Sequence, residues 1–148
     1  MEYAQGEVGR VFYARFDHGE DILEGLTKLA EKEQVRSGWF QLFGGLLSAD
    51  VVIGPEQPVM PPTPVWNRVD DGREVLGVGS IFFDGDKPLL HLHAAMGYHG
   101  ETLTGCVRKH TEVYLLIEAV VYELKGMDIT RPWFEKGGFN RPELRQAD

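Results

Sequence analysis

One segment of this sequence has the periodicity of an amphipathic helix, and that fact most limits the folds open to the chain. In residues 18–38, apolar side chains recur three or four positions apart and fall on one helical face. These side chains are Ile22, Leu23, Leu26, Leu29 and Ala30. We expect the helix to begin at Asp17 or Gly19, and Gly38 to close the connection to the next element.

The other apolar segments are typical of β-strands, because they are rich in β-branched and aromatic residues and are separated by turn residues. The expected strands are residues 8–17, 39–54, 73–83, 88–96, 101–108 and 111–124. Gly44-Gly45 interrupts the second of them and predicts a bulge or a close backbone approach. One helix beside an antiparallel β-sheet predicts an α+β fold.

Two segments do not fit either pattern. Residues 55–72 carry five prolines and are expected to be irregular. A loop of this length in a compact domain is either functional or packs against another subunit. The C-terminal tail, 125–148, is also expected to be irregular, although its aromatic residues Trp133, Phe134 and Phe139 predict that it docks on the domain. The 148 residues fit a single domain, 1–148.

Charge and composition limit the function classes. The chain has 15 basic and 23 acidic side chains, a net charge of −8, which weighs against nucleic acid as the main partner. No apolar run approaches the roughly 18 residues of a membrane span, so we expect no membrane association. A single cysteine cannot form an internal disulfide, and the N-terminus has no signal-peptide pattern. We therefore expect a cytoplasmic protein.

The stretch "LLHLHAAMGYHGETLTGCV", residues 89–107, contains the strongest chemical pattern. His91 and His93 are two apart on an expected strand, so their side chains share one face. If Tyr98-His99 forms the turn, His91 lies opposite Cys106 and His93 lies opposite Thr104. His91, His93 and Cys106 then form a candidate site for Zn²⁺, with the fourth tetrahedral position open. A register slip of one residue would move the cysteine to the other face.

The same residues have a structural interpretation. An H-x-H pair can be two polar residues on a half-buried sheet, and a free cysteine is commonly a small buried apolar residue. Glu118 lies inside an apolar run, where an unpaired carboxylate is costly. We expect it to have a partner: a basic side chain, a metal-bound histidine or a symmetry mate. Glu118 and Glu74 are the candidate acid/base residues if the site is catalytic.

Several quoted segments together resemble a known family, the plants and prokaryotes conserved (PPC) domain. In chain order they are "GEDILEGLTKLAEKEQV", "FGGLLSADVVI", "GREVLGVGSIFFDGDKPLLHLHAAMG", "TGCVR" and "EAVVYELKG". The resemblance covers a core of about residues 8–131, and its most specific part is the H-x-H strand. It implies a compact α+β domain that assembles as a homotrimer. It also implies DNA association by analogy with plant members, which carry AT-hooks, and some prokaryotic members look like metal-site proteins.

The sequence departs from the family pattern in two ways. No R-G-R-P core of an AT-hook is present, and "NRPELR" does not replace it, so specific DNA binding is not expected. Many members have Gly-Gly-His where this chain has Thr104-Gly105-Cys106. Cysteine is still a competent zinc ligand.

Three functions are therefore considered. The favoured one is a stand-alone, trimeric PPC-domain protein, a binding or regulatory module with a His/Cys metal site and a small-molecule or protein partner. The alternative is a zinc-dependent enzyme acting on an unidentified small molecule. The third, a DNA-associated regulator, is disfavoured by the acidic charge.

Overall fold

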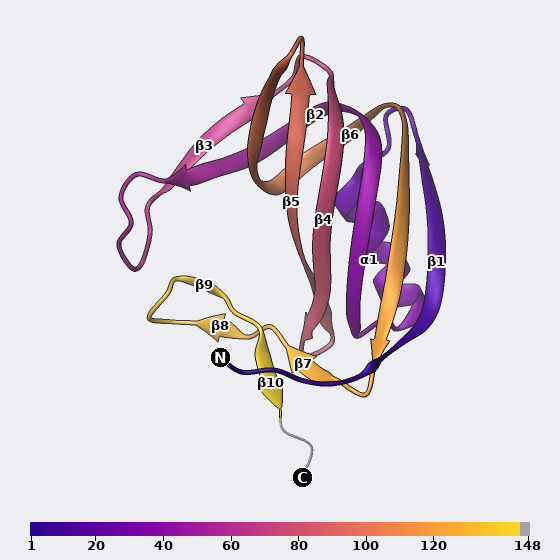
Figure 1. Cartoon of the computed structure of the whole chain (residues 1–148), viewed down its shortest axis with the longest axis vertical. Coiled ribbons are helices and arrows are strands. Elements are labelled where there is room, and N and C mark those ends of the chain that lie inside the picture. Colours follow the sequence, from indigo (N-terminus) through magenta and orange to yellow (C-terminus); the bar gives the residue numbers. More distant parts are fainter. Residues whose placement is uncertain (146–148) are drawn as a thin grey trace.

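A strongly bent, mostly antiparallel sheet wraps around one helix in the computed structural model, which describes residues 1–145 (Figure 1). The α+β fold expected from the sequence is confirmed. The elements are β1 Glu7–Asp17, α1 Ile22–Glu33, β2 Ser37–Pro55, β3 Pro64–Val69, β4 Arg73–Asp84, β5 Lys87–Tyr98, β6 Glu101–Lys125, β7 Asp128–Thr130, β8 Trp133–Phe134, β9 Phe139–Asn140 and β10 Glu143–Arg145. Among the described residues, no helix is long and apolar enough to cross a membrane.

The sheet bends because β2 and β6 are long enough to pair with different strands along their lengths. Its order is β10-β7-β4-β5-β6-β2-β3, with β1 added at β6 and a further pairing between β2 and β4. The sheet thus closes on itself, because β4 pairs with β5, β5 with β6, β6 with β2, and β2 again with β4. The core fills the inside of this curved sheet and is covered by the apolar face of α1. Its largest fully buried side chains include Phe40, Phe83, Leu26, Ile81 and Ile117.

The helix begins later than the sequence indicates. Its N-cap is Asp21 rather than Asp17 or Gly19, and an Asp21 carboxylate oxygen accepts a hydrogen bond from the Glu24 backbone N–H at 2.9 Å. The same carboxylate accepts two more from Thr111 of β6, one from its hydroxyl at 2.7 Å and one from its backbone N–H at 2.9 Å. Asp21 is favoured because one side chain caps the helix and ties it to the sheet.

The end of the helix also differs from the prediction. Gln34 adopts a left-handed conformation, with φ of 53°, and ends the helix there. Gly38 lies within β2 instead of closing the connection. The bulge expected at Gly44-Gly45 is present, since the pairing of β2 with β6 shifts register between these two glycines. Gly44 has φ of +138°, and a Cβ atom there would collide with the carbonyl oxygen of Leu116.

Two segments expected to be irregular contain strands. In 55–72, residues Pro64–Val69 form β3, which begins at the last of the five prolines and in which Trp66 pairs with Val52 of β2. In the tail 125–148, β7 extends the sheet beside β4 and pairs with β10, while β8 and β9 form a small hairpin. Residues 146–148 of this tail lie outside the described residues.

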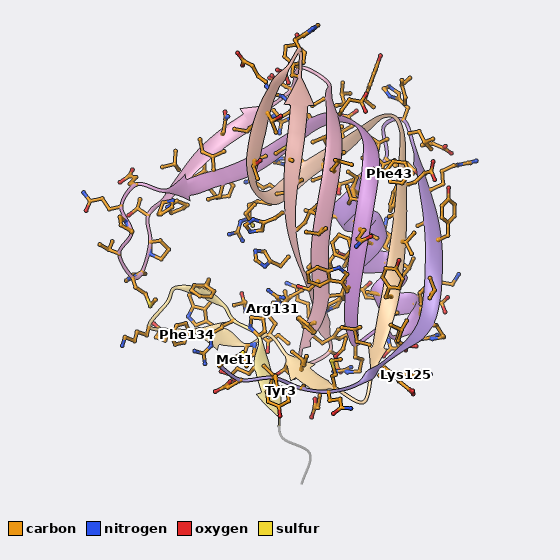
Figure 2. The ribbon with its side chains drawn as sticks, in the orientation of Figure 1. Met1, Tyr3, Phe43, Lys125, Arg131 and Phe134 are labelled. Atoms are coloured by element: carbon orange, nitrogen blue, oxygen red, sulfur yellow. The ribbon has the colours of Figure 1, made fainter. Side chains whose placement is uncertain are left out.

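The convex side of the sheet is unusually apolar. Along β1, β2 and β4, side chains that point away from the core are exposed, some by more than half. This outer apolar face consists of Val11, Tyr13, Trp39, Phe43, Leu76 and Val78. Leu76 is 69% exposed and is paired with Phe43, which is 52% exposed and is labelled in Figure 2. Exposed apolar areas of this kind are typical of interaction surfaces.

Candidate metal centre

Strand β5 presents the two histidines on the side of the sheet that faces away from the core. Leu92 and Ala94 alternate with them and point into the core, where they are 2% and 3% exposed. His93 pairs with Val78 of β4 on one side and with Cys106 of β6 on the other. Strand alternation therefore brings side chains from two strands to one place.

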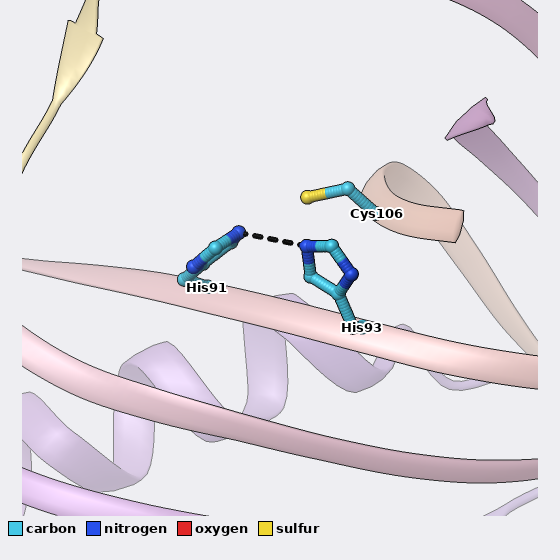
Figure 3. A group of neighbouring side chains, drawn as sticks. All are labelled: His91, His93 and Cys106. Atoms are coloured by element: carbon cyan, nitrogen blue, oxygen red, sulfur yellow. Dashed lines mark hydrogen bonds between the residues drawn. The ribbon is translucent and has the colours of Figure 1, made fainter. Parts of the chain in front are cut away.

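The three side chains predicted to bind metal converge, as Figure 3 shows. The potential ligand atoms of His91, His93 and Cys106 all lie within 4.8 Å of one another. The Nε2 atoms of the two histidines are 3.1 Å apart and their rings meet edge to face at 85°. For these two nitrogens to form a hydrogen bond, one Nε2 must carry the proton and the other must accept it with its lone pair.

The pairing within this hairpin differs from the expected one. The turn is formed by His99-Gly100 rather than Tyr98-His99, because both central residues need positive φ and these have 47° and 88°. Cys106 consequently lies opposite His93, not opposite His91. Moving the turn by one residue changes each pairing by two positions, which preserves the face of every side chain.

Burial and neighbouring charge set the protonation of the site. The pKa of His91 is lowered to about 4, chiefly by burial and then by the positive charges of Arg131, His93 and Arg108. The pKa of the Cys106 thiol is raised by burial, which outweighs the opposing effect of the two arginines. At neutral pH His91 therefore offers a lone pair, whereas the thiol must lose its proton to bind a metal ion.

The two glutamates considered as acid/base residues lie outside the cluster. Glu118 does have a partner, but of a kind not foreseen: its carboxylate accepts a hydrogen bond from the Tyr13 hydroxyl at 2.8 Å. It lines a shallow hollow of about 460 Å³ on the outer apolar face, together with His93. Glu74 is exposed on β4 opposite Gly97. Neither carboxylate belongs to the group of ligand atoms found among the described residues.

A second cavity, of about 410 Å³, lies beside the cluster and was not foreseen from the sequence. His91 borders it, and Arg108 and Arg131 supply two positive charges. Its walls include the aromatic side chains of Trp66, Trp133 and Phe139. The one signal in the sequence was the expectation that the aromatic residues of the tail dock on the domain, and two of these residues, Trp133 and Phe139, line this cavity.

The fold and this site define a small α+β domain with a cluster of three potential metal ligands at its surface. Comparison with known proteins agrees at the level of the family: residues 3–125 match the model of the Plants and Prokaryotes Conserved domain. The chain belongs to this family. Among curated proteins, none matches the sequence.

Solved structures share the fold across nearly the whole chain. A plant- and prokaryote-conserved protein from Pyrococcus horikoshii is 22% identical, with a TM-score of 0.83 over 99% of this chain and 100% of that one. A metal-containing protein from Archaeoglobus fulgidus is 22% identical, with a TM-score of 0.81 over 95% and 98%. A protein from Ralstonia eutropha whose name proposes DNA binding is 18% identical, with a TM-score of 0.76 over 90% of each chain. At these identities the likeness establishes the fold alone.

Proposed function

We propose that this chain is a cytoplasmic, trimeric binding module of the PPC family that holds Zn²⁺ between His91, His93 and Cys106. The observation that carries the proposal is the convergence of three potential ligand atoms within 4.8 Å of one another. Two imidazole nitrogens and one thiolate form a donor set that zinc prefers, and three protein ligands leave one coordination position open. Because the pKa of His91 is lowered to about 4, its imidazole is neutral at pH 7 and offers a lone pair to the ion.

The structural neighbour from Archaeoglobus fulgidus, described as metal-containing, supports a metal in this fold. The neighbour from Ralstonia eutropha supports an association with DNA. For this chain we expect DNA binding to be weak, independent of sequence and strongly salt-sensitive, because its net charge is −8. Sub-micromolar binding to a duplex at physiological salt would contradict this. The positions of Glu118 and Glu74 lend no support to the enzyme alternative.

The zinc proposal is tested by measuring metal content after purification without a polyhistidine tag. We expect stoichiometric zinc in the wild-type protein and in the control His99→Ala, whose side chain lies in the turn outside the cluster. His93→Ala and Cys106→Ser should lose most of the metal, while circular dichroism shows an intact fold. Wild-type zinc content in both ligand variants would contradict the assignment, as would a wild-type protein that binds no zinc when the ion is added.

The trimer proposal is supported by the outer apolar face, which a monomer would leave in water. The exposed apolar side chains of Val59 and Met60, in the segment between β2 and β3, also support an assembly that would cover them. Light scattering should give three times the 16.7 kDa mass of one chain. Leu76→Asp should dissociate the assembly, whereas Ile53→Asp, also an exposed apolar residue but outside the outer apolar face, should not. A monomeric wild-type protein would overturn the proposal.

A further inference from the structure

The two arginines of the cavity differ from the other arginines of this acidic chain. Among described side chains, those that form an ion pair with a carboxylate are Arg10, Arg15, Arg36, Arg68, Arg73 and Arg141. Within residues 1–145, neither Arg108 nor Arg131 has such a pair. In a chain with 23 acidic side chains, two arginines that line the same cavity without a carboxylate partner require an explanation.

The lack of a carboxylate partner is most costly for Arg131, because this side chain is only 5% exposed. It is held where the C-terminal segment meets the sheet (Figure 2). Its backbone N–H donates to the Phe83 carbonyl at 2.9 Å, and its Nη2 donates to the Ser80 hydroxyl at 2.7 Å. Its Nε is buried without a hydrogen-bond partner in the described structure. Burial lowers the pKa of Arg131, yet a guanidinium stays charged at any physiological pH. Burying a cation without an ion-pair partner costs folding free energy, unless a bound anion neutralises its charge.

The space beside Arg131 has the size and walls of a small-molecule site. About 410 Å³ falls within the range of ligand pockets, which are mostly apolar with a few charged groups that fix orientation. Here Trp66, Trp133 and Phe139 supply the apolar walls and the arginines supply the charge. His91 borders the same cavity, so a bound molecule would lie next to the metal cluster.

We propose that this cavity is the anion-binding subsite of the metal centre, in which Arg108 and Arg131 hold the carboxylate or phosphate group of a small aromatic or apolar molecule. A guanidinium binds either group through paired N–H donors. This proposal adds a ligand class to the proposed zinc site. Only one part of it rests on that proposed function: that the bound molecule reaches the open coordination position of the metal. Anion binding itself needs no metal. A DNA duplex is the poorer candidate, because its phosphates lie on a broad, regular surface and Arg131 is buried.

Calorimetric titration with three probes tests the proposal: benzoate, phenyl phosphate and the neutral isostere benzamide. Each is added to the intact protein, once after treatment with EDTA and once with zinc. We expect at least one anion to bind about tenfold or more tightly than benzamide, because a hydrogen bond to a charged group contributes about 1.5–3 kcal/mol. The preference between benzoate and phenyl phosphate separates a carboxylate ligand from a phosphate ligand. Equal binding of all three probes, or of none, overturns the proposal.

Variants test the residues assigned to the subsite. Arg108→Met and Arg131→Met should each weaken anion binding about tenfold or more. Lys136→Met removes the same charge from the β8–β9 hairpin, outside the cavity lining, and should leave affinity unchanged. Because Arg131 is buried and its variant could misfold, the exposed Arg108 gives an independent result. Unchanged affinity in Arg108→Met overturns the proposal, as does full displacement of the probe by a DNA duplex.

The two arms with and without zinc keep this proposal separate from the metal assignment. Anion binding to EDTA-treated protein, together with a failure to bind zinc, would support the subsite and reject the metal centre. Zinc binding without any preference for anions would do the reverse.

Discussion

The ion pair between Arg10 of β1 and Glu123 of β6 gives a prediction whose size follows from its geometry. Arg10 Nε and Nη2 donate to the two Glu123 carboxylate oxygens at 2.9 and 2.8 Å, and the Arg10 backbone N–H adds a third bond at 3.1 Å. Arg10 Nη2 also donates to the carbonyl of Glu33, the last residue of α1, at 2.7 Å. The pair therefore joins two strands and the end of the helix.

These bonds lower the pKa of Glu123 from 4.5 to about 2, with the Arg10 side chain as the largest cause and its backbone N–H next. Lowering the pKa of Glu123 from 4.5 to about 2 corresponds to at most about 3.4 kcal/mol, since a tenfold change in an equilibrium constant is about 1.36 kcal/mol. The Glu123 side chain is 14% exposed but that of Arg10 is 45% exposed, so solvent screening reduces the contribution. We expect about 1–2 kcal/mol of unfolding free energy from this pair at pH 7.

The pH dependence follows from the direction of the shift. Since the pKa is lower in the folded state, the contribution is complete above about pH 4.5 and disappears as pH falls through about 2. Glu123→Gln should therefore destabilise the protein by about 1–2 kcal/mol at pH 7 and by less than half as much near pH 3. Urea unfolding at a fixed protomer concentration measures both values.

Glu31→Gln, which removes an exposed carboxylate on the helix, is the control and should change stability little at either pH. Equal destabilisation by Glu123→Gln at pH 7 and pH 3 would refute the electrostatic reasoning. No destabilisation at pH 7 would refute the importance of the pair altogether.

Three further predictions concern the site and the strands around it. Gly79→Ala should destabilise the protein by about 1–3 kcal/mol in urea unfolding, because its Cβ would approach the His91 carbonyl oxygen to 2.6 Å; Gly97→Ala, with no atom nearer than 3.9 Å, should cost less. His99→Val should lower thermal stability more than His99→Asn, because φ of 47° is strained for a β-branched residue; equal melting temperatures would count against the turn geometry. Zinc affinity should rise about tenfold per pH unit between about pH 6 and 8 as the Cys106 proton is displaced, and a flat profile would contradict the raised thiol pKa.

Local patterns predicted much of the fold. The helical spacing in 18–38 located α1, and the alternation of residues in 73–83 and 88–96 located β4 and β5. What failed depends on distant contacts. The prolines of 55–72 obscured β3, which forms because β2 provides a partner strand. The expected strands 101–108 and 111–124 are one continuous strand, β6, which bends at positive-φ residues instead of ending.

For the metal site, the sequence correctly predicted that the histidines share one face of the sheet. It did not predict which histidine lies opposite Cys106. The spacing of His91 and His93 determines that they share a side, whatever their neighbours. Their distance from Cys106 along the hairpin depends on the turn, and a choice between two adjacent turn positions decided it. Arg131 could not be identified, because nothing near it in the sequence shows that the tail places it beside β4 and β5.

The pairing of β1 with β6 has a consequence for how the protein is made. Glu7 pairs with Lys125, so β1 leaves the ribosome long before its sheet partner, the last part of β6, has been synthesised. At about 5–20 residues per second, β1 waits about 6–24 s with its backbone unpaired and its apolar side chains uncovered. During translation such a segment can pair with other nascent chains, which makes β1 the segment where we expect chaperone binding and aggregation to concentrate.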